Sequence, residues 1–256
     1  MKFVAHRGES QAAPENTLES FALAWARGVK CVEGDFYMTK DEVIVCMHDT
    51  NSKRTCGIDR ELEDMTLAEI KTLDCGKWKS QEWEFTKVPT LEEILQIMPD
   101  HGEIFIELKS VGRILDKMAE VIAKSGCRAE QITFIAFDMD VISATKKRFP
   151  EHQAYWLYSN GLNIPGDNPP YGMSSEELIA KLRELGVDGV DLEVRLKRRV
   201  ASKEYIDALH QAGFSCNVWV VDDSQDAASL IELGVDSITT NRAYALQQEL
   251  IYNKQI

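Results

Sequence analysis

Residues 178–194 read LIAKLRELGVDGVDLEV and contain the pattern that decides the fold. The first eight residues place apolar side chains at helical spacing, Gly186 follows them, and an apolar, strand-like run comes next. A glycine directly after a helix adopts the left-handed conformation that ends the helix and turns the chain. The stretch therefore predicts a helix and a strand joined by a short connection.

The same pattern recurs at three other places in the chain. Helical runs end at Gly28, Gly213 and Gly234, and each glycine is followed by an apolar run: VKCVEGDFYMT, FSCNVWVV and VDSITT. Repeated helix–strand units with short connections imply parallel strands linked by right-handed crossovers. We therefore expect an α/β protein built around a parallel sheet.

Nine runs are strand candidates, and together they suggest a closed barrel. The connection between the second and third runs, CVEGDFYMT and VIVCMH, is too short for a parallel crossover. The two runs therefore form either a hairpin or one bent segment that occupies a single barrel position. Eight positions remain, which predicts a (β/α)8 TIM barrel, with a doubly wound open sheet as the alternative. The nine runs are residues 3–6, 31–39, 43–48, 103–109, 132–137, 154–159, 187–194, 214–221 and 236–240.

Two segments interrupt the regular alternation. Residues 50–90, together with the helical run LEEILQIM that follows, look like a small insertion after the second barrel strand. Residues 159–175 are rich in Gly, Pro and Asn and predict a loop. Both follow strands, so we expect both over the C-terminal face of one domain spanning residues 1–256, where barrel loops shape a site.

Composition and charge exclude some classes of function. The chain has 256 residues, 44% of them hydrophobic, and no apolar run approaches the roughly 18 residues of a membrane span. A net charge of −13 argues against a nucleic-acid partner, because phosphate backbones are bound by clustered Lys and Arg. No signal peptide is visible, so we expect a cytoplasmic protein, or a periplasmic or secreted one if a leader has been removed. The six cysteines suggest buried free thiols, with a Cys56–Cys75 bridge left open.

Carboxylates gather where two of the predicted strands end. Glu33 and Asp35 are two residues apart, so they point to the same side of their strand, and Glu107 and Lys109 repeat the spacing in another. Taken singly, the first pair is as well explained by a solvated strand end and the second by an isolated salt bridge. Together, three oxygen ligands from two strands suit a divalent cation, Mg²⁺ or Ca²⁺.

Two histidines also close strand runs, each followed by a charged residue. His6 precedes Arg7, and His48 precedes Asp49. Imidazole exchanges protons near neutral pH, so the two histidines are candidates for a general acid and base pair. Because the carboxyl ends of barrel strands meet at one mouth, we expect both histidines near the carboxylates.

Several ordered motifs together resemble the glycerophosphodiester phosphodiesterase family of metal-dependent TIM-barrel phosphodiesterases. They are HRG, PENTLESF, VEGDFYMTKDEVIVCMHD, KRTCG, PTLEEIL and IELK, with looser matches at NVWVV and ITTN. The resemblance implies the following roles: acid/base catalysis by His6 and His48, metal binding by Glu33, Asp35 and Glu107, phosphate neutralisation by Arg7 and Lys109, and substrate contacts by Trp219 and Glu15, with Asn16 holding the first loop. Trp219 is about as well explained as a core residue, and Glu193 is assigned to the barrel interior by period alone.

The family activity would be hydrolysis of a glycerophosphodiester to sn-glycerol 3-phosphate and an alcohol. Attack by the substrate's own 2-hydroxyl would form a cyclic phosphate that water then opens. One alternative is a phospholipase or lysophospholipase D-type enzyme for larger lipid head groups, with an apolar groove supplied by Trp78, Trp83, Phe85 and Tyr171. Another is a catalytically silent binding barrel, which the presence of both histidines and all three acids disfavours.

Three residues depart from the family pattern. Glu42 stands where the TKDG turn has glycine, Cys56 where a second Thr is common, and Asn241 where Asp is usual. None is a proposed ligand, so these departures leave the activity unaffected and bear on the alcohol or head-group preference.

Overall fold

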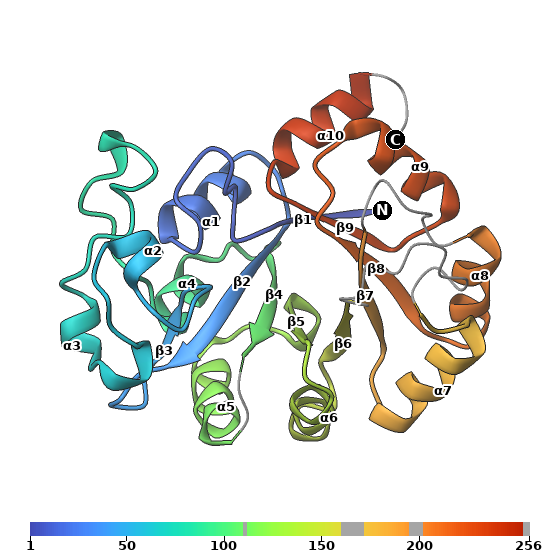
Figure 1. Cartoon of the computed structure of the whole chain (residues 1–256), viewed down its shortest axis with the longest axis horizontal. Helices are drawn as coiled ribbons and strands as arrows, with labels where there is room; N and C mark the ends of the chain where they lie inside the picture. Colours follow the sequence, from blue (N-terminus) through green and yellow to red (C-terminus); the bar gives the residue numbers. More distant parts are fainter. Residues whose placement is uncertain (110–111, 160–171, 195–201, 253–256) are drawn as a thin grey trace.

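The strands form a sheet that closes on itself (Figure 1). The computed structural model describes residues 1–109, 112–159, 172–194 and 202–252. All nine predicted strands are present, each within about two residues of the predicted bounds. They are β1 (Lys2–Ala5), β2 (Cys31–Met38), β3 (Ile44–Cys46), β4 (Glu103–Leu108), β5 (Ile132–Ala136), β6 (Gln153–Tyr158), β7 (Gly189–Glu193), β8 (Ser215–Trp219) and β9 (Ser237–Thr240).

Pairing between the strands confirms the TIM barrel. The order is β1-β9-β8-β7-β6-β5-β4-β2, and a further parallel pairing between β1 and β2 closes the ring. Val4 of β1 lies opposite Cys31 on one side and Thr239 on the other. An open doubly wound sheet would leave two strands at its edges, whereas every strand of this ring pairs on both sides, so that alternative is wrong.

β3 lies outside the ring and forms a hairpin with β2. The two strands are antiparallel, with Phe36 opposite Cys46 and Met38 opposite Ile44. Glu42 occupies the turn with a φ of 62°, in the left-handed region that glycine adopts more readily. The TKDE sequence therefore keeps a turn that needs a positive φ, and the first of the two predicted arrangements of β2 and β3 is the correct one.

Helices surround the barrel and cover its outer face (Figure 1). Their apolar sides pack on the outward-facing side chains of the strands in one large core. Gly28, Gly186, Gly213 and Gly234 all have positive φ at or directly after helix ends, as the sequence pattern predicted. The helices are α1 (Leu18–Ala26), α4 (Leu91–Ile97), α5 (Arg113–Ser125), α6 (Met139–Arg148), α7 (Ser175–Leu185), α8 (Lys203–Gln211), α9 (Ser224–Leu233) and α10 (Ala243–Tyr252).

The segment between β3 and α4 folds as an outlying unit at one side of the barrel, beyond β3 (Figure 1). It contains α2 (Lys53–Cys56), η1 (Leu62–Asp64), α3 (Leu67–Ile70) and η2 (Gln81–Trp83). Its apolar cluster includes Val45 of β3 and Met47, which follows β3. The run LEEILQIM, which the sequence grouped with the insertion, instead forms α4. That helix contacts both α1 and α5, because its apolar face belongs to the main core.

All six cysteines are free thiols. Cys56 and Cys75 are both free, so the bridge left open by the sequence is absent from the structure. Inside the barrel, side chains of five strands pack into a small apolar cluster: Val4, Cys31, Phe105, Ile135, Tyr155 and Leu157. Within the described ranges, no helix is long and apolar enough to cross a bilayer.

Candidate active site

The three predicted metal ligands meet inside the barrel. Glu33 and Asp35 lie on β2, Glu107 lies on β4, and the strand register places Asp35 opposite Glu107. One oxygen from each carboxylate lies within 4.8 Å of the other two, and all three side chains are buried. Side chains two apart share a face of a strand, so the sequence spacing accounts for the convergence.

Two basic side chains from neighbouring strand ends reach into this acidic cluster. Lys109 Nζ lies 2.8 Å from Asp35 Oδ1 and also pairs with Glu107. Arg7 Nε lies 3.4 Å from Asp35 Oδ2, and the Arg7 backbone N–H donates to Glu33 Oε2 at 2.9 Å. Burial would raise the pKa of Asp35, but the Lys109 and Arg7 cations hold it well below its usual range.

The pKa values of the other two carboxyls, Glu33 and Glu107, shift in the opposite direction. Burial, reinforced by the Asp35 and Glu107 charges, raises the pKa of Glu33 well above its usual range. Burial and the Asp35 charge raise the pKa of Glu107 to about 8. Glu33 Oε1 is buried and accepts no hydrogen bond from any described residue. A buried carboxylate oxygen without a partner is costly, so the cluster fits a divalent cation, which would satisfy the oxygen and offset the excess negative charge.

His6 is held by a chain of polar side chains from the far end of the sequence. Its Nδ1 lies 2.7 Å from Asn241 Oδ1, and the Asn241 amide donates to Asp222 Oδ2 at 2.7 Å. Because the Asn241 amide NH₂ donates to Asp222, its oxygen faces His6, and His6 therefore carries its proton on Nδ1. Its Nε2 lies 3.9 Å from Glu33 Oε2. Burial, together with the nearby Arg7 charge, lowers the pKa of His6 to about 4, so the ring is neutral at neutral pH.

His48 is held by a second, separate chain. Its Nδ1 donates to Asp49 Oδ1 at 2.7 Å, and Asp49 Oδ2 accepts from Arg54 Nε at 2.6 Å. Arg54 also donates through both terminal nitrogens to Glu15, at 2.7 and 3.0 Å. Glu15 in turn accepts from Arg7 at 2.9 Å, so a continuous line of charges runs from the support of His48 to Arg7, the residue after His6.

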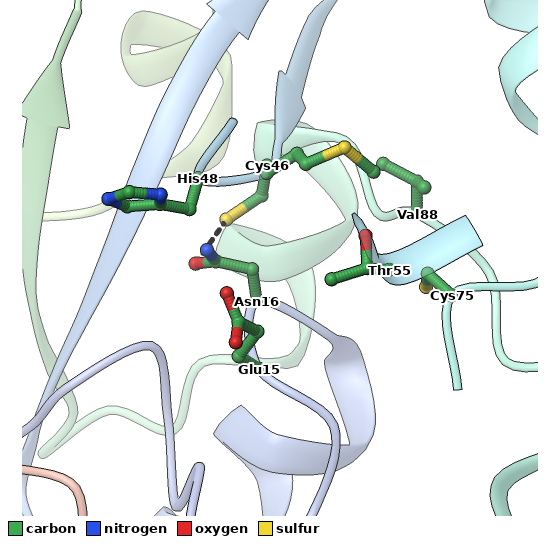
Figure 2. A pocket seen from close by; sticks show the side chains of 8 residues that line it. Glu15, Asn16, Cys46, His48, Thr55, Cys75 and Val88 are labelled. Carbon is green, nitrogen blue, oxygen red and sulfur yellow. Dashed lines mark hydrogen bonds between the residues drawn. The ribbon is translucent and has the colours of Figure 1, made fainter. Parts of the chain in front are cut away.

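Glu15 and Asn16 lie behind this site, around a smaller pocket (Figure 2). Asn16 has a φ of 58°, donates to Asp35 Oδ2 at 2.8 Å, and accepts a hydrogen bond from the Cys46 thiol. Figure 2 shows the Asn16 amide directed at that thiol, with Glu15 beside it. Both oxygens of Glu15 are engaged by arginines, so in this structure Glu15 contacts Arg7 and Arg54, and Asn16 orients the Asp35 carboxyl.

A cavity of about 230 Å³ opens between these groups and an apolar wall. Phe137 and Trp219 meet edge to face on the apolar side, with ring centroids 5.4 Å apart. The lining brings together seven of the predicted site residues, whereas Asp35 and Glu15 lie behind it. The cavity is lined by His6, Arg7, Glu33, His48, Glu107, Lys109, Ile135, Phe137, Leu157, Asp191, Trp219 and Thr239.

Other predicted residues lie elsewhere. Glu193, at the end of β7, accepts a hydrogen bond from the Ser159 hydroxyl. The Trp78 and Phe85 side chains are exposed on the outlying unit, and with Trp83 they do not line the 230 Å³ cavity. Tyr171, the fourth aromatic of the suggested groove, falls outside the described residues.

Sequence reasoning missed most of the residues that support the histidines. Asp222 and Arg54 were given no role, and Asn241 was noted only as a departure from the family pattern. The one local signal was the pair His48–Asp49, because an acidic residue directly after a histidine can bond to its ring. Asp222 and Asn241 are more than 200 residues from His6, and only the closure of the barrel brings them to it.

Known proteins and solved structures resemble this chain over nearly its whole length. The protein YhdW of Bacillus subtilis is 30% identical over 241 residues, covering 94% of each chain. The glycerophosphodiester phosphodiesterase of Caldanaerobacter subterraneus is 28% identical over 244 residues, covering 93% of each chain. A solved structure of a phosphodiesterase from Oleispira antarctica, in complex with the product sn-glycerol-3-phosphate, superimposes with a TM-score of 0.84 at 26% identity, covering 98% of this chain and 97% of that one.

A family model decides the assignment. The model of the glycerophosphoryl diester phosphodiesterase family matches residues 6–245, a span that runs from His6 through every strand that carries a cavity residue. Because the match includes both strand-end histidines and the acidic cluster, it covers the candidate site as well as the fold. The chain belongs to the glycerophosphoryl diester phosphodiesterase family.

Proposed function

We propose that this protein hydrolyses glycerophosphodiesters to sn-glycerol 3-phosphate and an alcohol, with a divalent cation, Mg²⁺ or Ca²⁺, at the acidic cluster. The observation that carries the proposal is that His6 and His48 line one cavity with Glu33, Glu107 and Lys109. Two proton carriers, an acidic cluster and fixed cations around one cavity are what phosphodiester cleavage requires. The product-bound Oleispira antarctica relative supports the choice of substrate.

The chain's own residues can bind and polarise the phosphate. Lys109 and Arg7 line the cavity and carry the positive charge that a bound phosphodiester needs. Glu33, Asp35 and Glu107 would hold the cation, which when bound supplies Lewis-acid stabilisation of negative charge on the substrate. Trp219 and Phe137 offer an apolar face on the other side of the cavity for the carbon skeleton.

The two histidines then divide the proton transfers. His6 is neutral and its Nδ1–H is held by Asn241, so its Nε2 is the base that accepts the proton of the glycerol 2-hydroxyl. His48 donates its Nδ1–H to the Asp49 carboxylate, which stabilises the positive charge the ring carries as an acid, and it protonates the leaving alcohol. Attack by the 2-hydroxyl gives a cyclic phosphate, and the histidines exchange roles when water opens it.

Point variants test these roles. His6→Ala and His48→Ala should each lower kcat for glycerophosphocholine by at least about 100-fold, the usual contribution of a positioned acid or base, while the fold is kept. His101→Ala is the matched control, because that histidine lies in an exposed turn before β4. Release of glycerol 3-phosphate is measured by an enzyme-coupled assay. Full activity in either cavity variant would contradict the assigned roles.

The nucleophile has a separate test. A diester of glycerol that lacks only the 2-hydroxyl should turn over poorly, because the cyclic intermediate cannot form. Equal rates on the two diesters would show that water attacks directly. The cation is identified by removing bound metal with a chelator and restoring activity with Mg²⁺ or Ca²⁺ added singly.

A further inference from the structure

Two polar side chains in the cavity have no role in the proposed mechanism. Asp191 on β7 is 1% exposed and Thr239 on β9 is 3% exposed. Asp191 Oδ1 and Thr239 Oγ1 form no hydrogen bond with any residue in the described part of the chain. Both residues line the 230 Å³ cavity that contains the histidines.

Asp191 lies on the opposite side of the barrel from β2. In the closed ring, β4, β5 and β6 lie between β2 and β7 on one side, and β1, β9 and β8 lie between them on the other. Asp191 therefore faces the cavity from the strand directly across the barrel from Glu33 and Asp35. Among the described residues that line the cavity, those on β6, β7 and β8 are Leu157, Asp191 and Trp219, and none of these three is basic.

A buried polar group without a partner costs stability unless a ligand or water satisfies it. Burial, with a further contribution from the Glu107 charge, raises the pKa of Asp191 well above its usual range, so it is suited to bind as a neutral carboxylic acid. A neutral acid both donates and accepts one hydrogen bond, and the threonine hydroxyl does the same. The chemical class that matches these two groups is an uncharged alcohol.

We propose that Asp191, assisted by Thr239, binds the terminal hydroxyl of the substrate's glycerol group, the hydroxyl remote from phosphorus. This inference rests on the proposed function and assigns one further part of the substrate. The 2-hydroxyl is used at the histidines, so the terminal hydroxyl is the remaining free polar group of the glycerol unit. The subsite would make the enzyme select glycerol over a diol of the same length that lacks the terminal hydroxyl.

A pair of chromogenic diesters tests the subsite. Glyceryl 4-nitrophenyl phosphate has both hydroxyls, and 2-hydroxypropyl 4-nitrophenyl phosphate keeps the 2-hydroxyl but lacks the terminal one. The protein should prefer the glyceryl diester by about 10- to 100-fold in kcat/KM, because the analogue leaves a buried polar group unpaired. Asp191→Leu should reduce the preference to less than about threefold, since the apolar side chain cannot bind the hydroxyl.

Further variants separate hydrogen bonding from cavity shape. Asp191→Asn keeps a donor and an acceptor without charge, so it should retain most of the preference, and Thr239→Val should lower it in part. Leu157→Val changes an apolar neighbour in the lining and should change kcat/KM for both diesters alike. In the ligand-free protein, Asp191→Leu should raise the melting temperature, because it removes an unpaired buried polar group.

The outcomes distinguish this inference from the proposed function. If the protein shows no preference, or if Asp191→Leu keeps the preference of the unmodified protein, the subsite assignment is overturned. If neither diester is hydrolysed, the proposed function fails, and binding decides the subsite. Glycerol 3-phosphate should then bind at least about tenfold more tightly than 1,2-propanediol 1-phosphate by calorimetry, and Asp191→Leu should abolish the difference. Equal binding of the two phosphates would overturn the subsite.

Discussion

Lys109 supplies the positive charge nearest to the acidic cluster, and its replacement by methionine tests how that cluster is stabilised. Its ammonium lies 2.8 Å from Asp35 and also pairs with Glu107, and the side chains of Lys109 and Asp35 are 14% and 1% exposed. Methionine keeps most of the length and apolar volume of the lysine side chain but removes the charge. Lys109→Met therefore leaves two buried carboxyls with one cation fewer.

The size of the effect follows from the remaining contacts. Removing one partner of a buried ion pair commonly costs about 3–5 kcal/mol. Arg7 still lies 3.4 Å from Asp35, and Glu107, whose pKa is raised to about 8, can bind a proton in the variant. We therefore expect the lower end, about 3 kcal/mol, which for a chain of this size lowers Tm by about 6–12 °C in chelator.

Added cation should recover most of that loss. The cation recovers the difference only if it binds the variant more tightly than the unmodified protein, and binding that is about 100-fold tighter contributes about 2.7 kcal/mol, close to the expected loss. It should stabilise the variant more than the unmodified protein, because it supplies the charge that the ammonium supplied before. The measurement is Tm by circular dichroism in chelator and in excess Mg²⁺ or Ca²⁺. A difference in Tm that is absent in chelator, or that stays the same in excess cation, would refute this account of the cluster.

Lys146→Met is the matched control. Lys146 Nζ pairs with Asp188 at 2.8 Å, and the two side chains are 18% and 26% exposed, so this pair is partly buried as well. It lies near the start of β6, away from the acidic cluster. The control should also lower Tm, but by the same amount with and without cation.

Three further changes address the supports of the site. Asp49→Asn should lower kcat at least about tenfold with little change in KM, because the amide can no longer stabilise the charged His48 ring; an unchanged kcat would contradict this. Arg54→Lys should lower kcat, because lysine cannot bond to two carboxylates as a guanidinium does. Tm should change by less than about 3 °C, because Arg54 is exposed and exposed ion pairs add about 0–1 kcal/mol. An unchanged kcat would show that Arg54 does not support His48. Gly8→Ala should destabilise the fold by about 1–3 kcal/mol, seen in urea unfolding, because Gly8 has a φ of +79° and a Cβ would lie 2.3 Å from Ser20 Oγ; unchanged unfolding would show that the loop can relax.

Much of the fold could be predicted because its signals are local. A glycine after each helix and a short apolar run after each glycine are contained within about 20 residues, and they gave the strands and the closed barrel. The convergence of Glu33, Asp35 and Glu107 followed from strand alternation plus the rule that barrel strand ends meet at one mouth. The assignment of α4 to the insertion was wrong because the TLEEI sequence at its start closely resembles the TLAEI sequence at the start of α3. Only the packing of α4 against α1 and α5 distinguishes the two helices.

The supports of the site could not be predicted because they join parts of the chain that no local pattern relates. The contact between His6 and Asn241 depends on the pairing of β1 with β9, which closes the barrel. Asp191 could not be recognised as a site residue for a related reason: in sequence it is a polar residue in a mostly apolar strand. Its lack of a partner is a property of the folded interior.

The two supports also explain how the outlying unit contributes to the site. His6 is held from β9 and the loop after β8, which are parts of the barrel itself, whereas His48 is held by Arg54 of α2 through Asp49. The position of α2 depends in turn on the apolar cluster that joins the outlying unit to β3. The proposed base, His6, is therefore fixed by the closed sheet, and the proposed acid, His48, by the unit beside it. A change in the packing of that unit should act on His48 and leave His6 in place, so it should slow protonation of the leaving alcohol more than attack on phosphorus.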